Sequence, residues 1–434
     1  MSIRLDRNTQ LTVLIAAVGY GVDLFDTFLL PALRVPMLKN LGVADTASLS
    51  VYTTVFNWQL AGMFFGALLL WGPLADLSGR RKILLGSILT YGIGSLLTAA
   101  VQDVQQLSII RFLAGIGLGG ELGAGVTLMA ENVTRQQRSQ GAMLIGCAGM
   151  LGVVGAALLA KTSLDWRTIY VLGGLLAFGV LAIRIRISES RLFLRAARPR
   201  QPAPTYGVLL RALLAPRTFL KLIACVLVGA PTFFVTGFIV PGAPEFAAAF
   251  HMQTLPSPPT ALIWTYLSIA IGDVLCGALS LRLRSRKRAL LVFHGITLFG
   301  IALLVLLPPS TPEGFYVRCA VAGLGIGFWA NMVTNAAEQF GTDLRATATI
   351  VVPTAVRLLL FPISAAILYM KPTVGLIQAT TIVGLITSVT AIIATSVLRD
   401  GFSADLDFKE FPAHEPLTDS PSVTARPRTQ GDTP

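Results

Sequence analysis

Charged residues are scarce in this chain: Asp, Glu, Lys and Arg make up only 13% of its 434 residues. A soluble globular protein is nearer a quarter charged, so the composition excludes an ordinary soluble fold. The three histidines are too scattered to form a ligand cluster. The four cysteines lie in apolar stretches at no metal-ligand spacing, which favours small buried side chains over disulfides or a metal site.

Catalytic motifs are absent as well. The sequence contains no nucleophile elbow, no phosphate-binding loop and no zinc signature. We therefore expect no enzyme activity and no cofactor. Without a nucleotide-binding loop, the energy for any transport has to come from an ion gradient, and protons are the first candidate.

Apolar sequence takes the place of these features. Hydrophobic residues make up 54% of the chain and the mean hydropathy is +0.71, as in a polytopic membrane protein. Twelve windows are long enough to cross a bilayer, so the expected fold class is all-α with twelve transmembrane helices. The windows lie near residues 11–33, 50–71, 83–101, 106–130, 140–160, 166–187, 222–242, 260–281, 289–308, 315–337, 347–370 and 373–397.

The basic residues predict the orientation. They gather at the N-terminus, in alternate loops and in the connector between windows six and seven, whereas the intervening loops carry few. By the positive-inside rule both termini are cytoplasmic, in a multi-pass plasma membrane, the inner membrane of a bacterium. The net charge of +12 is explained by this topology and needs no nucleic-acid partner. The first window exceeds 20 residues and contains two aspartates, so we interpret it as a retained span and not a signal peptide.

The chain is a diverged duplication. From Arg111 to Glu131 is 20 residues and on to Arg138 is 7; from Arg318 to Glu338 is again 20 and on to Arg345 again 7. Each frame contains glycines at alternate positions, which permit close helix packing. We expect two six-helix halves, at 1–187 and 218–398, a basic linker at 188–217 and a disordered cytoplasmic tail at 399–434.

One loop motif indicates the family. The sequence GPLADLSGRRK joins windows two and three and contains Gly72, Asp76, Gly79, Arg80 and Arg81. It closely resembles the loop signature of the major facilitator superfamily, as do the span count and the central connector. The resemblance implies two pseudo-symmetric six-helix bundles that rock about a central site.

The resemblance also implies a cytoplasmic charge lock. It would be formed by the loop motif with Glu131 and Arg138, and in the second half by Glu338 and Arg345. The second-half loop departs from the family pattern, because Leu281 replaces an aspartate and Arg284 a glycine. The second lock is therefore doubtful or rearranged.

Two carboxylates in the first window are the leading candidates for proton coupling. Asp23 and Asp26 are three residues apart, so they lie on nearly one face of a helix. Burial and mutual repulsion favour protonation of a carboxylate, and an opposing arginine favours its ionised form. The pattern resembles the Asp-Gly-x-Asp signature of aromatic-acid:proton symporters, with Leu24 in place of the glycine. LFDT resembles proton-linked sugar porters, which implies that Asp26 pairs with Arg111; a purely structural ion pair is the alternative.

Window four contains a further candidate. Gly119-Gly120-Glu121 resembles the metabolite:proton symporters, close relatives of the aromatic-acid carriers. Glu121 is a second possible proton carrier, or alternatively a residue of helix packing.

Arg357 is the candidate substrate ligand. It lies deep in window eleven between two prolines, and a buried guanidinium suits a carboxylate. Pairing with Asp273 or with a carbonyl is the alternative. Trp329 is more typical of a packing or interface residue than of a residue that stacks on a substrate. Weaker candidates, which could equally serve helix–helix bonding, are Asn57, Gln59, Asn331 and Asn335.

Together these features predict a proton-coupled symporter of a small anionic metabolite, for which a monomer is sufficient. One alternative is a proton-driven exporter or importer of a siderophore or drug-like compound. The fifth window lacks the Gly-Pro motif of drug antiporters, which argues against that branch. A non-transporting membrane sensor is the other alternative, but the tail is too short for a signalling domain.

Overall fold

The computed structural model describes residues 7–71, 74, 80–121, 138–185, 215–341 and 344–402. Within these ranges, the side chains of residues 7–13, 80–81, 138–143, 345–347, 349 and 350 are outside the description. All the regular structure in the described part is helical. Most of the predicted linker and most of the predicted tail lie outside the described residues.

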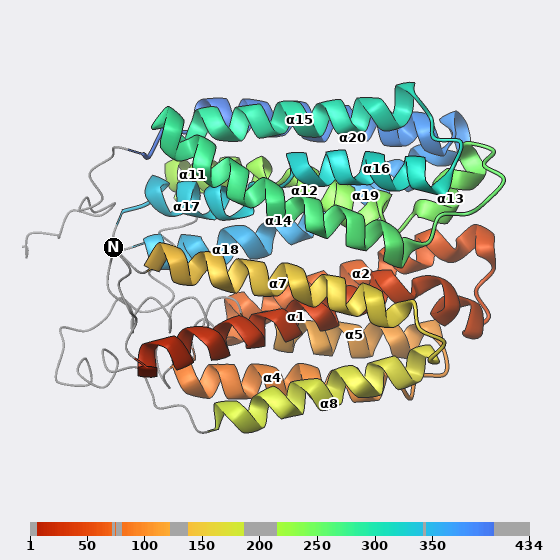
Figure 1. Ribbon diagram of the computed structural model, residues 1–434, viewed down its shortest axis with the longest axis horizontal. Coiled ribbons are helices and arrows are strands. Elements are labelled where there is room, and N and C mark those ends of the chain that lie inside the picture. Colours follow the sequence, from red (N-terminus) through yellow and green to blue (C-terminus); the bar gives the residue numbers. More distant parts are fainter. Residues whose placement is uncertain are drawn as a thin grey trace, which may run out of the picture.

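The helices of the first half lie together, in red to yellow in the lower part of Figure 1. The long α1 tolerates Pro31 and Pro36, and α2 continues into a π-helical turn, η1. In chain order the elements are α1 (Arg7–Asn40), α2 (Asp45–Phe65), η1 (Gly66–Trp71), α4 (Arg80–Thr98), α5 (Val104–Leu118), α7 (Arg138–Ala160) and α8 (Trp166–Arg184).

The helices of the second half lie above them in Figure 1, in green to blue. Several are interrupted, and α16 and α17 are separated by a break at residues 326–328. The elements are α11 (Pro216–Val228), α12 (Ala230–Phe234), η2 (Val235–Ile239), α13 (Ala243–Ala249), α14 (Pro258–Leu283), α15 (Arg286–Leu306), α16 (Pro312–Gly325), α17 (Trp329–Gln339), α18 (Arg345–Leu358), α19 (Leu360–Val374) and α20 (Leu376–Val397).

The described helices correspond to the predicted windows. Eight continuous or nearly continuous segments are long and apolar enough to cross a membrane, and Pro216–Ile239 forms a ninth span bent by 42°. Three shorter apolar helices, Lys82–Thr98, Val104–Leu118 and Leu144–Ala160, occupy windows three, four and five. The twelve predicted spans are therefore present.

The same helix pairings recur in both halves, as expected for a duplication. In the first half α2 packs on α5, α4 on α5 and α4 on α8; in the second, α14 packs on α16, α15 on α16 and α15 on α20. These are spans 2 and 4, 3 and 4, and 3 and 6, followed by their counterparts six spans later. The two halves are thus pseudo-symmetric bundles.

The predicted glycine packing in window four is confirmed. A methyl group at Gly115 would lie 2.2 Å from the carbonyl oxygen of Gln59, and one at Gly119 would lie 2.2 Å from that of Met63. Only a residue without a side chain allows α5 to approach the α2 backbone so closely.

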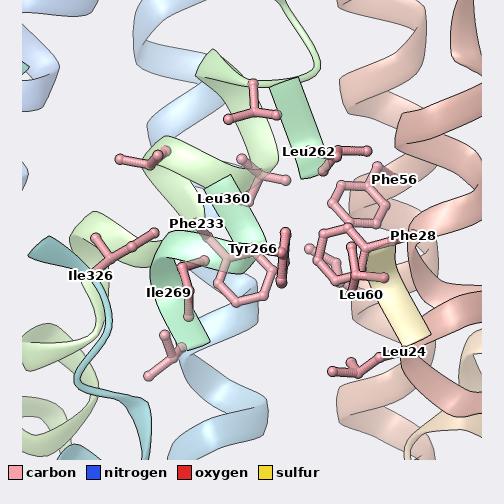
Figure 2. Close-up of a cluster of buried hydrophobic side chains, with 14 of the residues drawn as sticks. Leu24, Phe28, Phe56, Leu60, Phe233, Leu262, Tyr266, Ile269, Ile326 and Leu360 are labelled. Carbon is pink, nitrogen blue, oxygen red and sulfur yellow. The ribbon is translucent and has the colours of Figure 1, made fainter. Parts of the chain in front are cut away.

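The halves meet along α1, α2 and α7 on one side and α14, α18 and α19 on the other. Figure 2 shows Phe28 and Phe56 facing Tyr266 across this boundary, and the rings of Phe28 and Tyr266 meet edge to face with centroids 4.9 Å apart. Below, "the N-terminal face" is the end of the bundle at which α1 begins, and "the opposite face" is the end at which it finishes.

The second-half loop keeps the turn of the family pattern despite its changed residue. Arg284 follows α14 with φ of 47°, in the left-handed region that glycine favours. Asp400 then caps α15: it accepts from the backbone N–H of Arg286 at 3.0 Å and from the Ser285 hydroxyl. Residues 399–402, predicted as the start of the tail, therefore lie against the bundle.

Replacing Arg284 with glycine is expected to stabilise the protein by about 1 kcal/mol, because an L side chain is strained at this φ. The change in stability is measured from the thermal unfolding midpoint of the purified protein in detergent. The matched variant Arg282→Gly, two residues earlier and inside α14, should lose about 1 kcal/mol. If both variants are destabilised equally, the left-handed turn is not strained.

Candidate functional site

Besides Arg34, near the end of α1, six charged side chains of the described residues are buried inside the bundle. Three are carboxylates and three are guanidiniums, so their formal charges balance. None is more than 4% exposed. They are Asp23, Asp26, Glu121, Arg111, Arg184 and Arg357.

Asp26 and Arg111 form the first ion pair. Arg111 Nη2 lies 3.0 Å from Asp26 Oδ2, and the Ser95 hydroxyl donates to Asp26 Oδ1. Arg111 Nε donates to Gln59 Oε1 at 3.0 Å, and the Gln59 amide donates to the Thr27 carbonyl at 3.2 Å. The predicted contact between windows one and four exists, and the side chains of Ser95 and Gln59 hold it in place.

Glu121 and Arg184 form the second pair, nearer the N-terminal face. Arg184 Nη1 lies 2.8 Å from Glu121 Oε2, and Nη2 lies 2.5 Å from Oε1. Nη2 also donates to the carbonyl oxygen of Ile15 on α1 at 3.3 Å. Both side chains are 1% exposed. A bidentate pair of this kind joins α1 and α8 to the segment that follows α5 in fixed geometry.

Gly19 makes room for this second pair. A methyl group there would lie 1.6 Å from Arg184 Nη2 and 2.5 Å from Glu121 Oε1. The ion pair therefore lies directly against the α1 backbone, four residues before Asp23 on the same helix face.

Replacing Gly19 with alanine is expected to lower the stability by about 3 kcal/mol, because the methyl group displaces the guanidinium and leaves a buried charge poorly paired. Thermal unfolding of the purified protein checks this. Gly179→Ala is the matched control, since α8 leaves open space at that position. Equal melting temperatures for the two variants would contradict the contact.

Asp23 lies between the two pairs and belongs to neither. Ile15, Gly19, Asp23 and Asp26 follow one another along about 16 Å of α1. Asp23 is fully buried, and within the described residues neither of its carboxylate oxygens has a hydrogen-bond partner. Asp23 is close enough to both Glu121 and Arg357 for electrostatic interaction. A buried carboxylate without a hydrogen bond is costly, so it is a site for a proton or a mobile positive charge.

Arg357 faces Asp23 from the second half. It is 4% exposed, its Nη1 donates to the Pro353 carbonyl of its own helix at 3.4 Å, and the Tyr20 side chain of α1 lies near it. The predicted alternative of a carbonyl contact is present, but Asp273 is not its ion-pair partner. Asp273 instead accepts from the backbone N–H of Ala330 at 3.0 Å, at the start of α17.

Aromatic side chains surround this guanidinium. The Arg357 guanidinium carbon lies 5.8 Å from the centroid of the Trp329 ring, within the range of a cation–π contact. Tyr266 lies near both Tyr20 and Arg357, and its ring contacts Phe28. An anion at Arg357 would therefore have aromatic neighbours from both halves.

The weaker predicted ligands lie in other places. Asn57 donates to the Ser364 hydroxyl at 3.1 Å, across the boundary between the halves. Gln59 uses both ends of its amide inside the first half, as described above. Asn331 contacts Cys276 and the Arg286 backbone, so it lies in a network of the second half away from Arg357. Asn335 is buried, and within the described residues its Oδ1 has no hydrogen-bond partner.

The predicted charge locks are only partly described. Glu338 of the second-half frame lies 3.4 Å from Arg286 Nε, so the pair that is described joins α17 to α15. The other residues of the predicted locks lie outside the description. Four are undescribed altogether: Gly72, Asp76, Gly79 and Glu131. Four more have undescribed side chains: Arg80, Arg81, Arg138 and Arg345.

Sequence reasoning missed three residues of this site. Arg184 ends an apolar window and is followed by Arg186, so it looks like an ordinary basic flank of a span. A buried carboxylate at Glu121 could have raised the question of a matching cation. Ser95 and Tyr20 carry no signal in a single sequence, because hydroxyl side chains are common in membrane helices.

Comparison with known proteins agrees with this architecture. Residues 14–362 match the sequence model of the Major Facilitator Superfamily. The chain is 30% identical to the 3-(3-hydroxy-phenyl)propionate transporter of Escherichia coli over 298 residues, which are 68% of this chain and 71% of that protein. It is 32% identical to the 4-hydroxybenzoate transporter PcaK of Pseudomonas putida over 194 residues, 44% of this chain and 42% of that protein, so this match spans less than half of that transporter.

Among solved structures, a crystal structure of a D-xylose-proton symporter superposes with a TM-score of 0.70. The superposition covers 91% of this chain and 98% of that one, at 14% sequence identity. This likeness concerns the fold: two six-helix bundles arranged as in that transporter.

Proposed function

The chain belongs to the Major Facilitator Superfamily, and we propose that it carries an aromatic monocarboxylate across the membrane together with a proton. Membership in a family of transporters accounts for a multi-pass membrane protein without catalytic motifs. One observation carries the proposal. Of the six buried charged side chains described above, four form two ion pairs, and Asp23 in the first half and Arg357 in the second remain outside these pairs.

The two complete ion pairs have fixed partners. Asp26 is held by Arg111 and Ser95, and Glu121 is held by Arg184. Removing one partner of a buried pair costs several kcal/mol, so neither pair is suited to exchanging its partner during every cycle. We therefore assign the proton to Asp23. The sequence favoured Asp26, and the hydrogen-bond pattern favours its neighbour three residues earlier.

Charge balance couples the two ligands. In the empty site an ionised Asp23 offsets the charge of Arg357 across the boundary. When a carboxylate pairs with Arg357, that guanidinium has a new counter-charge, and an ionised Asp23 becomes an uncompensated buried anion. Binding a proton relieves this cost, because a neutral carboxylic acid is far less expensive to bury. The anion and the proton therefore bind favourably together, with no net charge moved.

Aromatic surroundings support the substrate class. Trp329 and Tyr266 from the second half and Tyr20 from the first lie near the Arg357 guanidinium. A guanidinium recognises the carboxylate in a forked geometry, and the rings offer flat apolar contact to an aromatic body. Two relatives are named as transporters of hydroxylated aromatic acids, which agrees with such a site.

The orientation follows from the basic residues. Arg282, Arg284 and Arg288 are exposed at the N-terminal face, near the ends of α14 and α15. By the positive-inside rule we assign this face to the cytoplasm and the opposite face to the outside of a bacterial inner membrane. An external pH below the internal pH then drives uptake. A monomer is sufficient for this mechanism.

Accumulation in proteoliposomes tests the proposal. With an acidic exterior, we expect uptake of labelled 3-(3-hydroxyphenyl)propionate or 4-hydroxybenzoate above equilibrium, and its loss on addition of a protonophore. D-Xylose is the control solute, since it has no carboxylate. Accumulation driven by an acidic interior would instead indicate a proton-driven exporter. Uptake at the same rate and to the same level with and without a pH gradient would contradict proton coupling.

A further inference from the structure

A third buried ion pair joins the two halves near the opposite face. Arg34, on α1, is fully buried, and the side chain of Glu245, on α13, is 16% exposed. Arg34 Nη1 lies 2.9 Å from Glu245 Oε1, and Nη2 contacts Oε2. The pair is bidentate, which restricts both distance and orientation. Because α1 and α13 belong to different halves, the pair exists only while the halves meet at this end.

The remaining donors of Arg34 are also engaged. Nε donates to the Pro241 carbonyl at 2.5 Å, and Nη1 donates to the Ser48 hydroxyl at 3.2 Å. The guanidinium also lies 5.7 Å from the centroid of the Tyr52 ring. One side chain thus binds α1 to α2 and to the segment that follows η2.

Further contacts between the halves continue inward from this pair. The Tyr52 hydroxyl donates to the Gly237 carbonyl at 3.1 Å, and Asn57 donates to Ser364 at 3.1 Å. Ser48, Tyr52 and Asn57 follow one another along about 13 Å of α2. A continuous set of polar contacts therefore runs from the opposite face toward the level of Arg357.

We propose that Arg34 and Glu245 form the gate of the opposite face. The pair closes the substrate site to that side in this structure, and it separates each time the halves part there. The inference rests on the proposed function only in requiring that the halves part at that face. The contacts that support the gate are independent of the charge balance between Asp23 and Arg357.

The chemistry suits a reversible closure. In the closed state the charges are desolvated, and their attraction and hydrogen bonds offset that cost. In the open state both charges regain water, so the lost contacts are largely compensated. If Glu245 loses its charge, Arg34 is left buried without a counter-ion, and the closed state is penalised more than the open one.

Thiol labelling measures this opening without substrate or a pH gradient. In a background from which the four native cysteines have been removed, Ser364→Cys places a near-isosteric reporter on the boundary, deeper than the gate. A membrane-impermeant thiol reagent is applied to intact cells, and the labelling rate is followed. Ser163→Cys, on the exposed loop at the opposite face, reports whether that face is outside; if it is not labelled, the same comparison is made in inverted vesicles.

We expect Glu245→Gln to raise the labelling rate of the reporter at least about tenfold. The matched variant Glu313→Gln, an exposed acidic residue at the same face, should leave the rate unchanged. Tyr52→Phe, which removes one hydrogen bond between the halves and no charge, should raise the rate about threefold.

An unchanged rate in Glu245→Gln, with the protein monodisperse on gel filtration, would overturn the gate. If that variant does not fold, the labelling rate of Tyr52→Phe decides in its place. A Tyr52→Phe labelling rate equal to that of the cysteine-free background with the reporter alone then overturns the proposal. Failure of proton-coupled uptake leaves either labelling result intact, so the two proposals fail independently.

Discussion

Replacing Arg357 with alanine is expected to raise the KM for an aromatic carboxylate by about 100-fold. The guanidinium is the buried cation without an ion-pair partner in the described part of the chain, and its loss leaves the substrate carboxylate in an apolar setting. Truncating one partner of a buried charge pair costs about 3 kcal/mol, which corresponds to a factor of about 100 in affinity. Initial rates of uptake over a range of substrate concentrations give the value.

Two further variants make this result specific. Arg357→Lys keeps the positive charge but lacks the planar fork, so we expect an intermediate rise in KM of about tenfold. Arg288→Ala removes an exposed arginine of the N-terminal face and should leave KM unchanged. An Arg357→Ala transporter with unchanged KM would remove Arg357 from the substrate site.

Replacing Asp23 with asparagine is expected to abolish proton-driven accumulation while exchange of internal for external substrate continues. The amide has nearly the shape of the protonated acid and cannot lose a proton. The site then binds the carboxylate on Arg357 without any change of protonation. Accumulation under an imposed pH gradient and counterflow without a gradient separate the two activities.

Asp26→Asn should behave differently from Asp23→Asn. Asp26 holds Arg111 at 3.0 Å, so losing its charge leaves a buried guanidinium unpaired and is expected to cost about 4 kcal/mol of stability. The amount of folded protein after purification reports this loss. If Asp23→Asn still accumulates substrate against a gradient, and Asp26→Asn folds normally but does not, the two aspartates have been assigned the wrong way round.

The fold was predictable from sequence because its signals are long and repeated. A transmembrane window extends over some twenty residues, and the equal spacing of the frames at Arg111 and Arg318 marks the duplication. The contact of Asp26 with Arg111 was implied by the resemblance of LFDT to proton-linked sugar porters, and the structure contains it. The glycines of window four indicated close packing, which the approach of Gly115 to the α2 backbone confirms.

Other parts of the site depend on helix rotation and on partners far away in the chain. Glu121 looked like a proton carrier until Arg184, 63 residues later, was found against it. Trp329 could not be distinguished from packing aromatics by sequence, because its ring approaches the Arg357 guanidinium only as a result of the break before α17. The ion pair of Arg34 could not be predicted either, because its partner Glu245 is 211 residues away.

The pH of the medium around proteoliposomes tests proton–carboxylate symport most directly. When an aromatic monocarboxylate is added outside at symmetric pH, we predict alkalinisation of the medium as protons enter with the anion. The signal should be abolished by a protonophore and in Asp23→Asn. Acidification of the medium would show antiport. Substrate entry without any pH change would show that no proton accompanies the carboxylate, and would contradict the proposed roles of Asp23 and Arg357.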